Sequence, residues 1–225
     1  MQNCQYRQMV NASSLHHNPY LPIQLIQQSI KGIQLLLATG RQSICDPEFP
    51  NKIREDRLDE IFTCTGCMQR CYYSESYEDP EEGVSCMINP FSGKEKRWVI
   101  TPAEEPKKIS IIGAGPAGLE AAWILAKRGH DVTVWEKSEV AGGQYRLAAV
   151  PPHKQDLAKT IQTYTALGTK AGVKWRFGHE VTAGELKDMD ADVLILAAGS
   201  VPVVPPIEGV SQGPTVQAND GLAGK

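Results

Sequence analysis

Two hydrophobic patterns alternate along the second half of the chain, from about residue 107 onwards. Short apolar runs predict four strands, at residues 108–115, 131–137, 173–178 and 191–199. Segments with helical spacing of apolar residues lie between them, at 117–129 and within 151–172. Strands that alternate with helices are typical of a parallel sheet, so this half predicts a doubly wound α/β domain.

The first half of the chain has a different pattern. The segment LPIQLIQQSIKGIQLLLATG spaces its apolar residues for an amphipathic helix at about 22–37. We expect a turn at DPEFPN (residues 46–51), because two prolines so close together interrupt a helix. The following KIREDRLDEIF (52–62) predicts a short helix, and an irregular segment then leads to the α/β domain.

Composition and charge exclude several classes of protein. Hydrophobic residues make up 41% and charged residues 22% of the chain, as in ordinary globular proteins. The formal net charge of -3 gives no basic surface for nucleic acid or for an anionic membrane. The sequence has neither an apolar run of about 18 residues nor a recognisable signal peptide. We therefore expect a cytoplasmic protein without nucleic-acid or membrane partners.

Four cysteines have the spacing of a metal or redox site. Cys64, Cys67 and Cys71 lie within eight residues, and Cys86 follows, which gives C-x2-C-x3-C-x14-C. Zinc binds four thiolates, usually as two C-x2-C pairs, whereas a [4Fe–4S] cluster commonly takes three from one segment and a fourth from elsewhere. The spacing favours iron–sulfur, and disulfides would need an oxidising compartment. Cys45 does not stand at a ligand position, and we expect it to be an ordinary thiol.

A glycine fingerprint, GAGPAG, follows the first predicted strand and opens the first predicted helix of the α/β domain. Gly113 permits a tight turn, Gly115 lets the backbone approach a pyrophosphate, and Gly118 lets helix and strand pack closely. The helix N-terminus favours phosphate. Glu136, at the end of the second strand, can accept hydrogen bonds from ribose hydroxyls. The order of these features predicts dinucleotide binding, but the fingerprint alone does not distinguish FAD from NAD.

Longer stretches of sequence carry a family resemblance. IIGAGPAGLEAAWILAKRGHDVTVWEKSEVAGGQ and the later LILAAGSVPVVPPIEG resemble the FAD-binding part of flavoprotein reductases with two dinucleotide sites. From Gly40 to Lys225, the order of DPEFPNK, the cysteines and the glycine fingerprint is similar to the multidomain NADH:flavin oxidoreductases. That family includes 2,4-dienoyl-CoA reductases, 2-enoate reductases and trimethylamine dehydrogenase. The small subunit of glutamate synthase is also cysteine-rich ahead of a flavin fingerprint, but DPEFPNKIREDRLDEI favours the dienoyl-CoA reductase type.

The resemblance implies a chain of cofactors. NAD(P)H would give a hydride to FAD, and a [4Fe–4S] cluster would pass single electrons to an FMN in a TIM barrel that reduces a small-molecule substrate. It places the cluster on Cys64, Cys67, Cys71 and Cys86. It places FAD on Gly113, Gly115, Pro116, Ala117, Gly118, Glu136, Lys137, Gly143, Gln144, Lys154 and Val181. Arg41 matches an arginine that contacts the FMN phosphate, and FMN is expected only if another chain, an FMN-barrel protein or subunit, supplies the barrel.

These expectations divide the chain into three parts and leave three alternatives open. The parts are a helical remnant of the end of a barrel (1–44), a cluster segment with a linker (45–105) and an incomplete FAD-binding Rossmann-like domain (106–225). The favoured alternative is an electron-transferring segment of an enoate or dienoyl-CoA type oxidoreductase. The others are a non-catalytic FAD and iron–sulfur subunit that docks on a separate flavoprotein, and a truncated gene product.

Overall fold

The computed structural model describes residues 39–72, 83–210 and 212–224. The chain divides into two compact units, one up to Val99 and one from Ile100. The helix predicted at 22–37 lies outside the described residues. The three-part division made from the sequence stays a prediction.

The second unit contains a parallel sheet. Its strands are β1 (Lys108–Ile112), β2 (Asp131–Trp135), β3 (Lys174–Arg176) and β4 (Val193–Leu196). Every neighbouring pair is parallel, and the strand order is β3-β2-β1-β4. The chain therefore moves outward from β1 to β3 and returns to the other side of β1, the reversal that marks a ligand site in doubly wound folds. The predicted α/β fold with a parallel sheet is confirmed.

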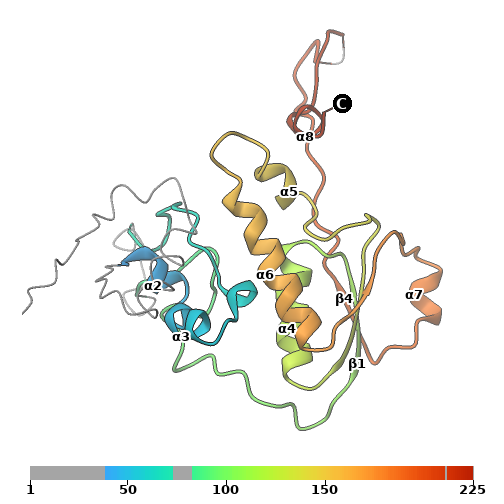
Figure 1. Cartoon of the computed structure of the whole chain (residues 1–225). Coiled ribbons are helices and arrows are strands. Elements are labelled where there is room, and N and C mark those ends of the chain that lie inside the picture. Colours follow the sequence, from blue (N-terminus) through green and yellow to red (C-terminus); the bar gives the residue numbers. More distant parts are fainter. Residues whose placement is uncertain (1–38, 73–82, 211, 225) are drawn as a thin grey trace, which may run out of the picture. The chain divides into compact units, whose positions relative to one another are not determined.

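The helix α4 (Pro116–Lys127) packs against β1 and β2, and α6 (Asp156–Lys170) packs against α4; Figure 1 shows the two helices side by side. Three consecutive residues of β1 (109–111) and alternate residues of β2 (Val132 and Val134) are buried, and Leu119 of α4 is fully buried. Such burial of aliphatic side chains is the main stabilising term of the unit. Three short helices complete it: α5 (Tyr145–Ala148), α7 (Glu185–Asp188) and α8 (Ala218–Leu222).

The first unit has short helices only among its described residues. These are α2 (Arg41–Cys45), α3 (Phe49–Arg54) and the 3-10 helix η2 (Leu58–Glu60). A small core forms where Phe49 and Ile53 of α3 pack with Ile61.

Two expectations for this unit were partly wrong. The turn predicted at 46–51 is shorter, because α3 begins at Phe49 with Pro50 in its first turn. Proline is tolerated there, since the first N–H groups of a helix have no intrahelical acceptor. The helix predicted at 52–62 breaks after Arg54, and Asp56 has a positive φ of 56° before η2 begins.

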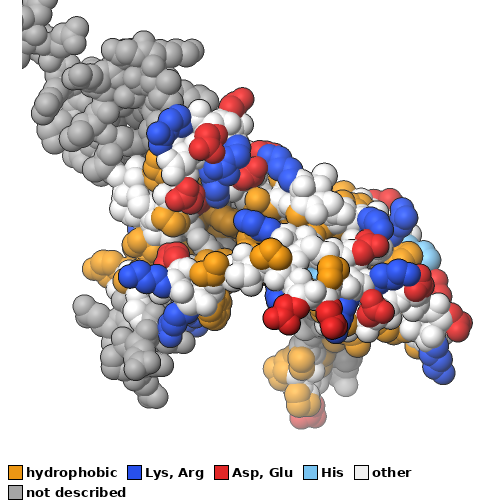
Figure 2. Space-filling model, turned by 90° about the horizontal axis from the view of Figure 1, so that it is seen from below, with side chains coloured by type: hydrophobic (Ala, Val, Ile, Leu, Met, Phe, Trp, Pro, Cys, Tyr) orange, Lys and Arg blue, Asp and Glu red, His pale blue; other side chains and the backbone are white. Residues whose placement is uncertain are grey.

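Charged side chains of both signs are interspersed over the face of the molecule in Figure 2. This agrees with a chain that has 23 basic and 26 acidic residues. Among the helices that the structure describes, none has both the length and the apolar character to cross a membrane.

Candidate cofactor sites

The glycine fingerprint forms the turn between β1 and α4, and two of its glycines have no room for a side chain. Gly113 has a φ of +107°, and a Cβ there would lie 2.4 Å from the carbonyl oxygen of Ala197, just after β4. A Cβ on Gly118 would lie 1.9 Å from the carbonyl oxygen of Gly113. Both contacts are with backbone, which cannot move aside cheaply. Close packing of α4, β1 and β4 therefore requires both glycines.

Gly115 lies in different surroundings. It is the N-cap of α4, and, apart from its own neighbours in the chain, no atom of the described residues lies within 4 Å of the position that its Cβ would take. Pro116 and Ala117, in the first turn of α4, are exposed. The first N–H groups of a 12-residue helix thus face an open approach beside a residue without a side chain. This arrangement fits a pyrophosphate group.

The carboxylate of Glu136 holds the glycine turn. Glu136 is buried, with 7% of its surface exposed. Its Oε2 accepts the N–H of Ala114 at 2.8 Å, and its Oε1 accepts the N–H of Ser138 at 2.9 Å. A carboxylate can accept about four hydrogen bonds, so acceptor capacity is left for ribose hydroxyls. The ribose contact stays a prediction, and the structure adds a role that the sequence did not indicate.

The GGQ segment, distant in sequence, lies against this turn. The N–H of Gly142 donates to the carbonyl oxygen of Ala114 at 2.7 Å. A Cβ on Gly143, whose φ is +50°, would lie 3.4 Å from the Cα of Gly115. The fold therefore brings Gly143, a predicted FAD residue, to the fingerprint.

Gln144 links two later segments of the second unit. Its amide nitrogen donates to the carbonyl oxygen of Ser200, and its Oε1 accepts from the amide of Asn219 at 2.9 Å. The side chain thus joins the segment that follows β4 to α8. Its predicted contact with FAD stays a prediction.

The three other residues that the resemblance assigned to FAD lie on loops. Lys137 directly follows Glu136 and is exposed. Lys154 is exposed just before α6, and Val181 is half-buried between β3 and α7. Their contacts with FAD stay predictions.

The four predicted cluster ligands are all free thiols in the structure. Cys64, Cys71 and Cys86 are half-buried, and Cys67 is exposed. Cys64 interacts electrostatically with both Cys71 and Cys86. Within the described ranges, no group of three or more His, Cys, Asp or Glu side chains is arranged to hold a metal ion. The assignment of these four ligands stays a prediction.

The sulfur of Cys86 is surrounded by hydrogen-bond donors. The S–H of Cys45 and the backbone N–H groups of Asn89 and Ile88 donate to it, the last at 3.4 Å. The bond from Cys45 is the largest cause that lowers the pKa of Cys86, against the opposing effect of burial. Donors of this kind stabilise a thiolate, the form in which cysteine binds iron.

Cys64 has a mixed environment. Burial raises its pKa, whereas a backbone hydrogen bond from Gly66 and the charge of Arg41 lower it. The guanidinium of Arg41 also lies close to Gly66, with Nη1 3.7 Å from where a Cβ would be. Arg41 therefore lies beside the cysteine loop, and its contact with an FMN phosphate stays a prediction.

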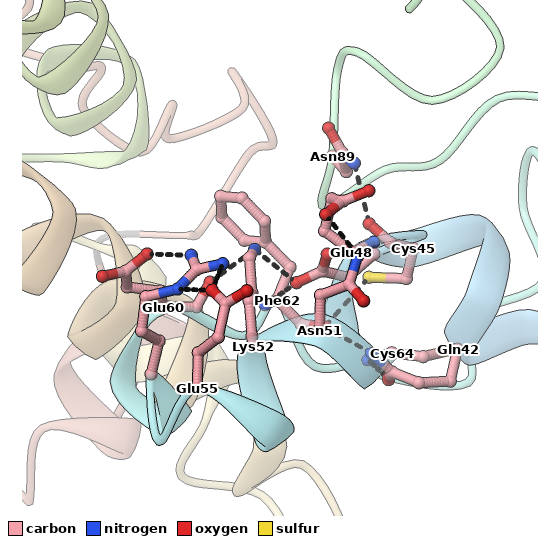
Figure 3. Close-up of polar contacts among 12 residues, drawn as sticks. Gln42, Cys45, Glu48, Asn51, Lys52, Glu55, Glu60, Phe62, Cys64 and Asn89 are labelled. Carbon is pink, nitrogen blue, oxygen red and sulfur yellow. Dashed lines mark hydrogen bonds and ion pairs between the residues drawn. The ribbon is translucent and has the colours of Figure 1, made fainter.

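Gln42 fixes the strand-like segment that leads into the cysteines (Figure 3). Its Nε2 donates to the carbonyl oxygen of Phe62 at 2.8 Å, and its Oε1 accepts the N–H of Cys64 at 2.9 Å. One side-chain amide thus takes the place of a neighbouring strand. It attaches Cys64 to α2.

A buried ion pair provides the second attachment. Oδ2 of Asp46 accepts both the N–H of Phe62 at 3.0 Å and Nζ of Lys52 at 2.7 Å. Lys52 also donates to the carbonyl oxygen of Glu60 at 2.9 Å. The exposed fractions of the two charged side chains are 3% and 12%. The DPEFPNK motif therefore supplies both members of this ion pair, which binds the backbone of the segment before Cys64.

The segment around Cys86 is attached to α2 as well. The amide of Asn89 donates to the carbonyl oxygen of Cys45 at 2.8 Å, and Oγ of Ser92 donates to that of Ile44 at 2.7 Å. Sequence reasoning missed this framework, because the bonded residues are 44 and 48 positions apart. For the ion pair of Asp46 and Lys52, a signal was present in the sequence, because both residues belong to the DPEFPNK motif.

Comparisons with known proteins agree with these features. Residues 105–223 match the model of the pyridine nucleotide-disulphide oxidoreductase family. The chain is 37% identical to a metal reductase of Desulforamulus reducens over 84% of its own length, and 38% identical to an NADH oxidase of Thermoanaerobacter brockii, also over 84%. A 2-naphthoyl-CoA reductase, solved with 2-naphthoyl-CoA, is structurally similar over 89% of this chain, with a TM-score of 0.79 and 36% identity.

The chain spans only a part of each of these proteins: 28% of the metal reductase, 29% of the NADH oxidase and 30% of the naphthoyl-CoA reductase. The resemblance seen in the sequence, to multidomain flavin-dependent reductases over the cysteine segment and the dinucleotide-binding part, is thereby confirmed. The chain belongs to the pyridine nucleotide-disulphide oxidoreductase family, and it matches one part of multidomain reductases of the NADH:flavin oxidoreductase type.

Proposed function

We propose that this chain is the electron-transferring part of a flavin- and iron–sulfur-dependent reductase. In this proposal it takes electrons from NAD(P)H through FAD and a [4Fe–4S] cluster toward an FMN-containing barrel on another polypeptide segment. The barrel would reduce an activated double bond of the enoate or dienoyl-CoA type.

The turn between β1 and α4 is the observation that carries the proposal. Gly113 and Gly118 keep the turn tight, Gly115 leaves the helix N-terminus open, and Glu136 fixes the turn by accepting the N–H of Ala114. These residues would hold the pyrophosphate and the adenosine ribose of FAD, whose flavin, when bound, can accept a hydride and release electrons singly. The protein's own contribution there is binding and orientation.

The cysteine segment offers a second set of donors in the same chain. Cys64, Cys67, Cys71 and Cys86 would supply the four thiolates that a [4Fe–4S] cluster requires. The backbone N–H groups and the Cys45 thiol around Cys86 would keep its sulfur in the thiolate form. Gln42 and Asp46 would fix the position of Cys64.

The relatives support a role in electron transfer more than a role in substrate choice. Their names refer to different substrates: a metal, NADH and 2-naphthoyl-CoA. Yet this chain matches 28–30% of the length of each. We infer that the matched part carries what these reductases share, and that the choice of substrate comes from outside it.

Anaerobic purification and reconstitution with iron, sulfide and FAD tests the proposal. We expect about one FAD and about four iron atoms per chain, with a visible spectrum that bleaches on reduction. Zinc without iron would refute the cluster, and a folded chain that binds neither flavin nor iron would refute the whole proposal. NADH-dependent dye reduction then shows whether the isolated chain accepts electrons from a nicotinamide by itself.

A further inference from the structure

The strand β4 forms one edge of the parallel sheet. In the order β3-β2-β1-β4 it has a single neighbour, and its residues Val193–Leu196 pair with β1. Among the described residues, no backbone hydrogen bond connects this strand to a segment other than β1. The outer edge of β4 therefore presents N–H and C=O groups without a partner in the sheet. Such an edge can pair with a strand of another chain.

The opposite edge strand, β3, differs from β4 in length and charge. β3 has three residues, and its exposed Lys174 and Arg176 are side chains of the kind that discourages pairing between edges. β4 reads VLIL, and the segment 193–207 contains no charged residue. The first proline of that segment is Pro202, beyond the end of the strand. Neither a charge nor a proline thus protects β4 from pairing.

One face of β4 is uncovered as well. The connections from β1 to β2 and from β2 to β3 run in the same direction, so right-handed crossovers place α4 and α6 on the same face of the sheet. The connection that leads to β4 contains only the four-residue helix α7. Leu194 and Leu196 are 40% and 71% exposed. Their register partners in β1 alternate with Ile109 and Ile111, which are buried on the other face.

Exposed apolar side chains continue beyond the strand. Six of them, between 40% and 84% exposed, form what we call the apolar strip: Leu194, Leu196, Val201, Val203, Val204 and Ile207. Together they present on the order of 400 Å² of apolar surface. A standard protein interface covers about 800 Å² of each partner, and somewhat more than half of that area is apolar. The apolar strip therefore comes close to the apolar area that a stable dimer requires.

We propose that the outer edge of β4 and the apolar strip form a dimer interface whose partner is a second copy of this chain. A strip without charge is complementary to itself, as a two-fold interface requires, because no like charges meet. In an antiparallel pair of β4 strands centred on Ile195, Leu194 of one copy lies opposite Leu196 of the other. Asp192 then lies opposite Ala198, so the acidic side chains of the two copies stay at opposite ends of the pair.

The two four-stranded sheets thereby join into one continuous sheet. The pairing uses neither the glycine turn nor the cysteine segment, so it goes beyond the proposed function and does not depend on FAD or on a cluster.

Sedimentation velocity of the full chain over a wide range of concentrations tests the proposal. A reductant is present throughout, so that the free cysteines form no disulfide between copies. We expect the mass of a dimer, which dissociates on dilution. Hydrogen–deuterium exchange at the same concentrations should show slower exchange of the β4 amides in the dimer, because the N–H groups on the outer edge gain partners.

Leu196→Lys compared with Val150→Lys locates the interface. Leu196 is 71% exposed, so lysine there should leave the single chain folded, whereas two buried charges should raise the Kd of the dimer at least about tenfold. Val150 is 54% exposed and follows α5, which packs against α6 and not against β4. Its lysine variant should dimerise like wild type. Circular dichroism shows whether both variants are folded.

Each outcome decides for or against the second copy. A wild-type chain that stays monomeric at every concentration overturns the proposal and leaves the strip to a different polypeptide. Mass that rises beyond a dimer overturns the closed two-fold pairing, and equal weakening by both lysines overturns the place of the interface. If Leu196→Lys does not fold, the wild-type exchange data decide, because a dimer whose β4 amides exchange as fast as in the monomer is formed elsewhere.

Discussion

The glycine turn of the second unit and the cysteine segment of the first unit hold their shapes by opposite means. The glycine turn is built on a regular parallel sheet, and its form depends on side chains that are absent, at Gly113 and Gly118. The cysteine segment has no strand among its described residues. The side chains of Gln42 and Asp46 instead accept the backbone N–H groups that a neighbouring strand would have bonded in a sheet. The first site should therefore be sensitive to added atoms, and the second to the loss of single polar atoms.

The largest effect is expected for Gly118→Ala. The new Cβ would lie 1.9 Å from the carbonyl oxygen of Gly113, a backbone atom that can yield only if α4 moves away from the turn. We expect a loss of more than about 4 kcal/mol in the free energy of unfolding. Urea unfolding followed by circular dichroism measures it, and FAD uptake should be lost as well.

Gly115→Ala is the matched control. Gly115 has a φ of -73° that alanine adopts readily, and the space around its Cβ is open. The variant should unfold like wild type yet bind FAD more weakly, because the methyl group would occupy the approach of a phosphate. Equal stability losses in the two alanine variants would contradict this account of the turn.

A smaller but substantial effect is expected for Asp46→Asn. The amide oxygen can replace Oδ2, but its NH2 group would then face the N–H of Glu48, which Oδ1 accepts at 3.1 Å, and the buried Lys52 would lose its counter-ion. The cost should be about 3 kcal/mol in the free energy of unfolding. Iron retention after reconstitution should fall, because the segment before Cys64 loses its attachment.

Glu55→Gln serves as the comparison for Asp46→Asn. It breaks the exposed ion pair of Glu55 with Arg57, whose side chains are 57% and 36% exposed. Exposed pairs contribute little, so stability and iron retention should stay at the wild-type level. A wild-type iron content in Asp46→Asn would show that the ion pair of Asp46 and Lys52 does not support the cluster segment.

The two regions also differ in how much of them the sequence could predict. Strands, α4, α6 and the glycine turn follow from short-range periodicity and local spacing, so the fold class and the place of the fingerprint between a strand and a helix were predicted correctly. The bonds of Gln42 and Asn89 join residues 20 to 44 positions apart, and no local pattern encodes them. The role of Glu136 in holding Ala114 was hidden for the same reason.

For Cys45, the sequence indicated one property of the residue and missed another. Its spacing sets it apart from the C-x2-C-x3-C-x14-C set, an exclusion that stays a prediction, and its burial agrees with an ordinary thiol. Its contact with Cys86, however, depends on how the chain folds back over 41 residues. Spacing identifies ligands that lie close in sequence, but it does not reveal the donors around them.

The smallest effect is expected for Glu120→Gln, within the helical layer of the second unit. Burial is the main cause that raises the pKa of Glu120 in α4, and hydrogen bonds from Tyr164 and Trp123 oppose it in part. A raised pKa favours the protonated folded state. Its contribution to stability is therefore full below the ordinary carboxyl pKa and is lost as the pH rises through the raised value.

Thermal unfolding of wild type and Glu120→Gln across a range of pH checks this sign. The glutamine stays neutral, so the variant should be at least as stable as wild type at neutral pH, and its advantage should disappear in acid. A variant that is less stable at neutral pH would show that the carboxylate is stabilised where it lies.

The bonds from Glu136 to Ala114 and Ser138 have a thermodynamic consequence for any dinucleotide that binds at the turn. The binding conformation exists before the ligand arrives, so association need not include the entropy of ordering this loop. The heat-capacity change measured by titration calorimetry should then reflect only the surface that the ligand covers, without a contribution from coupled folding.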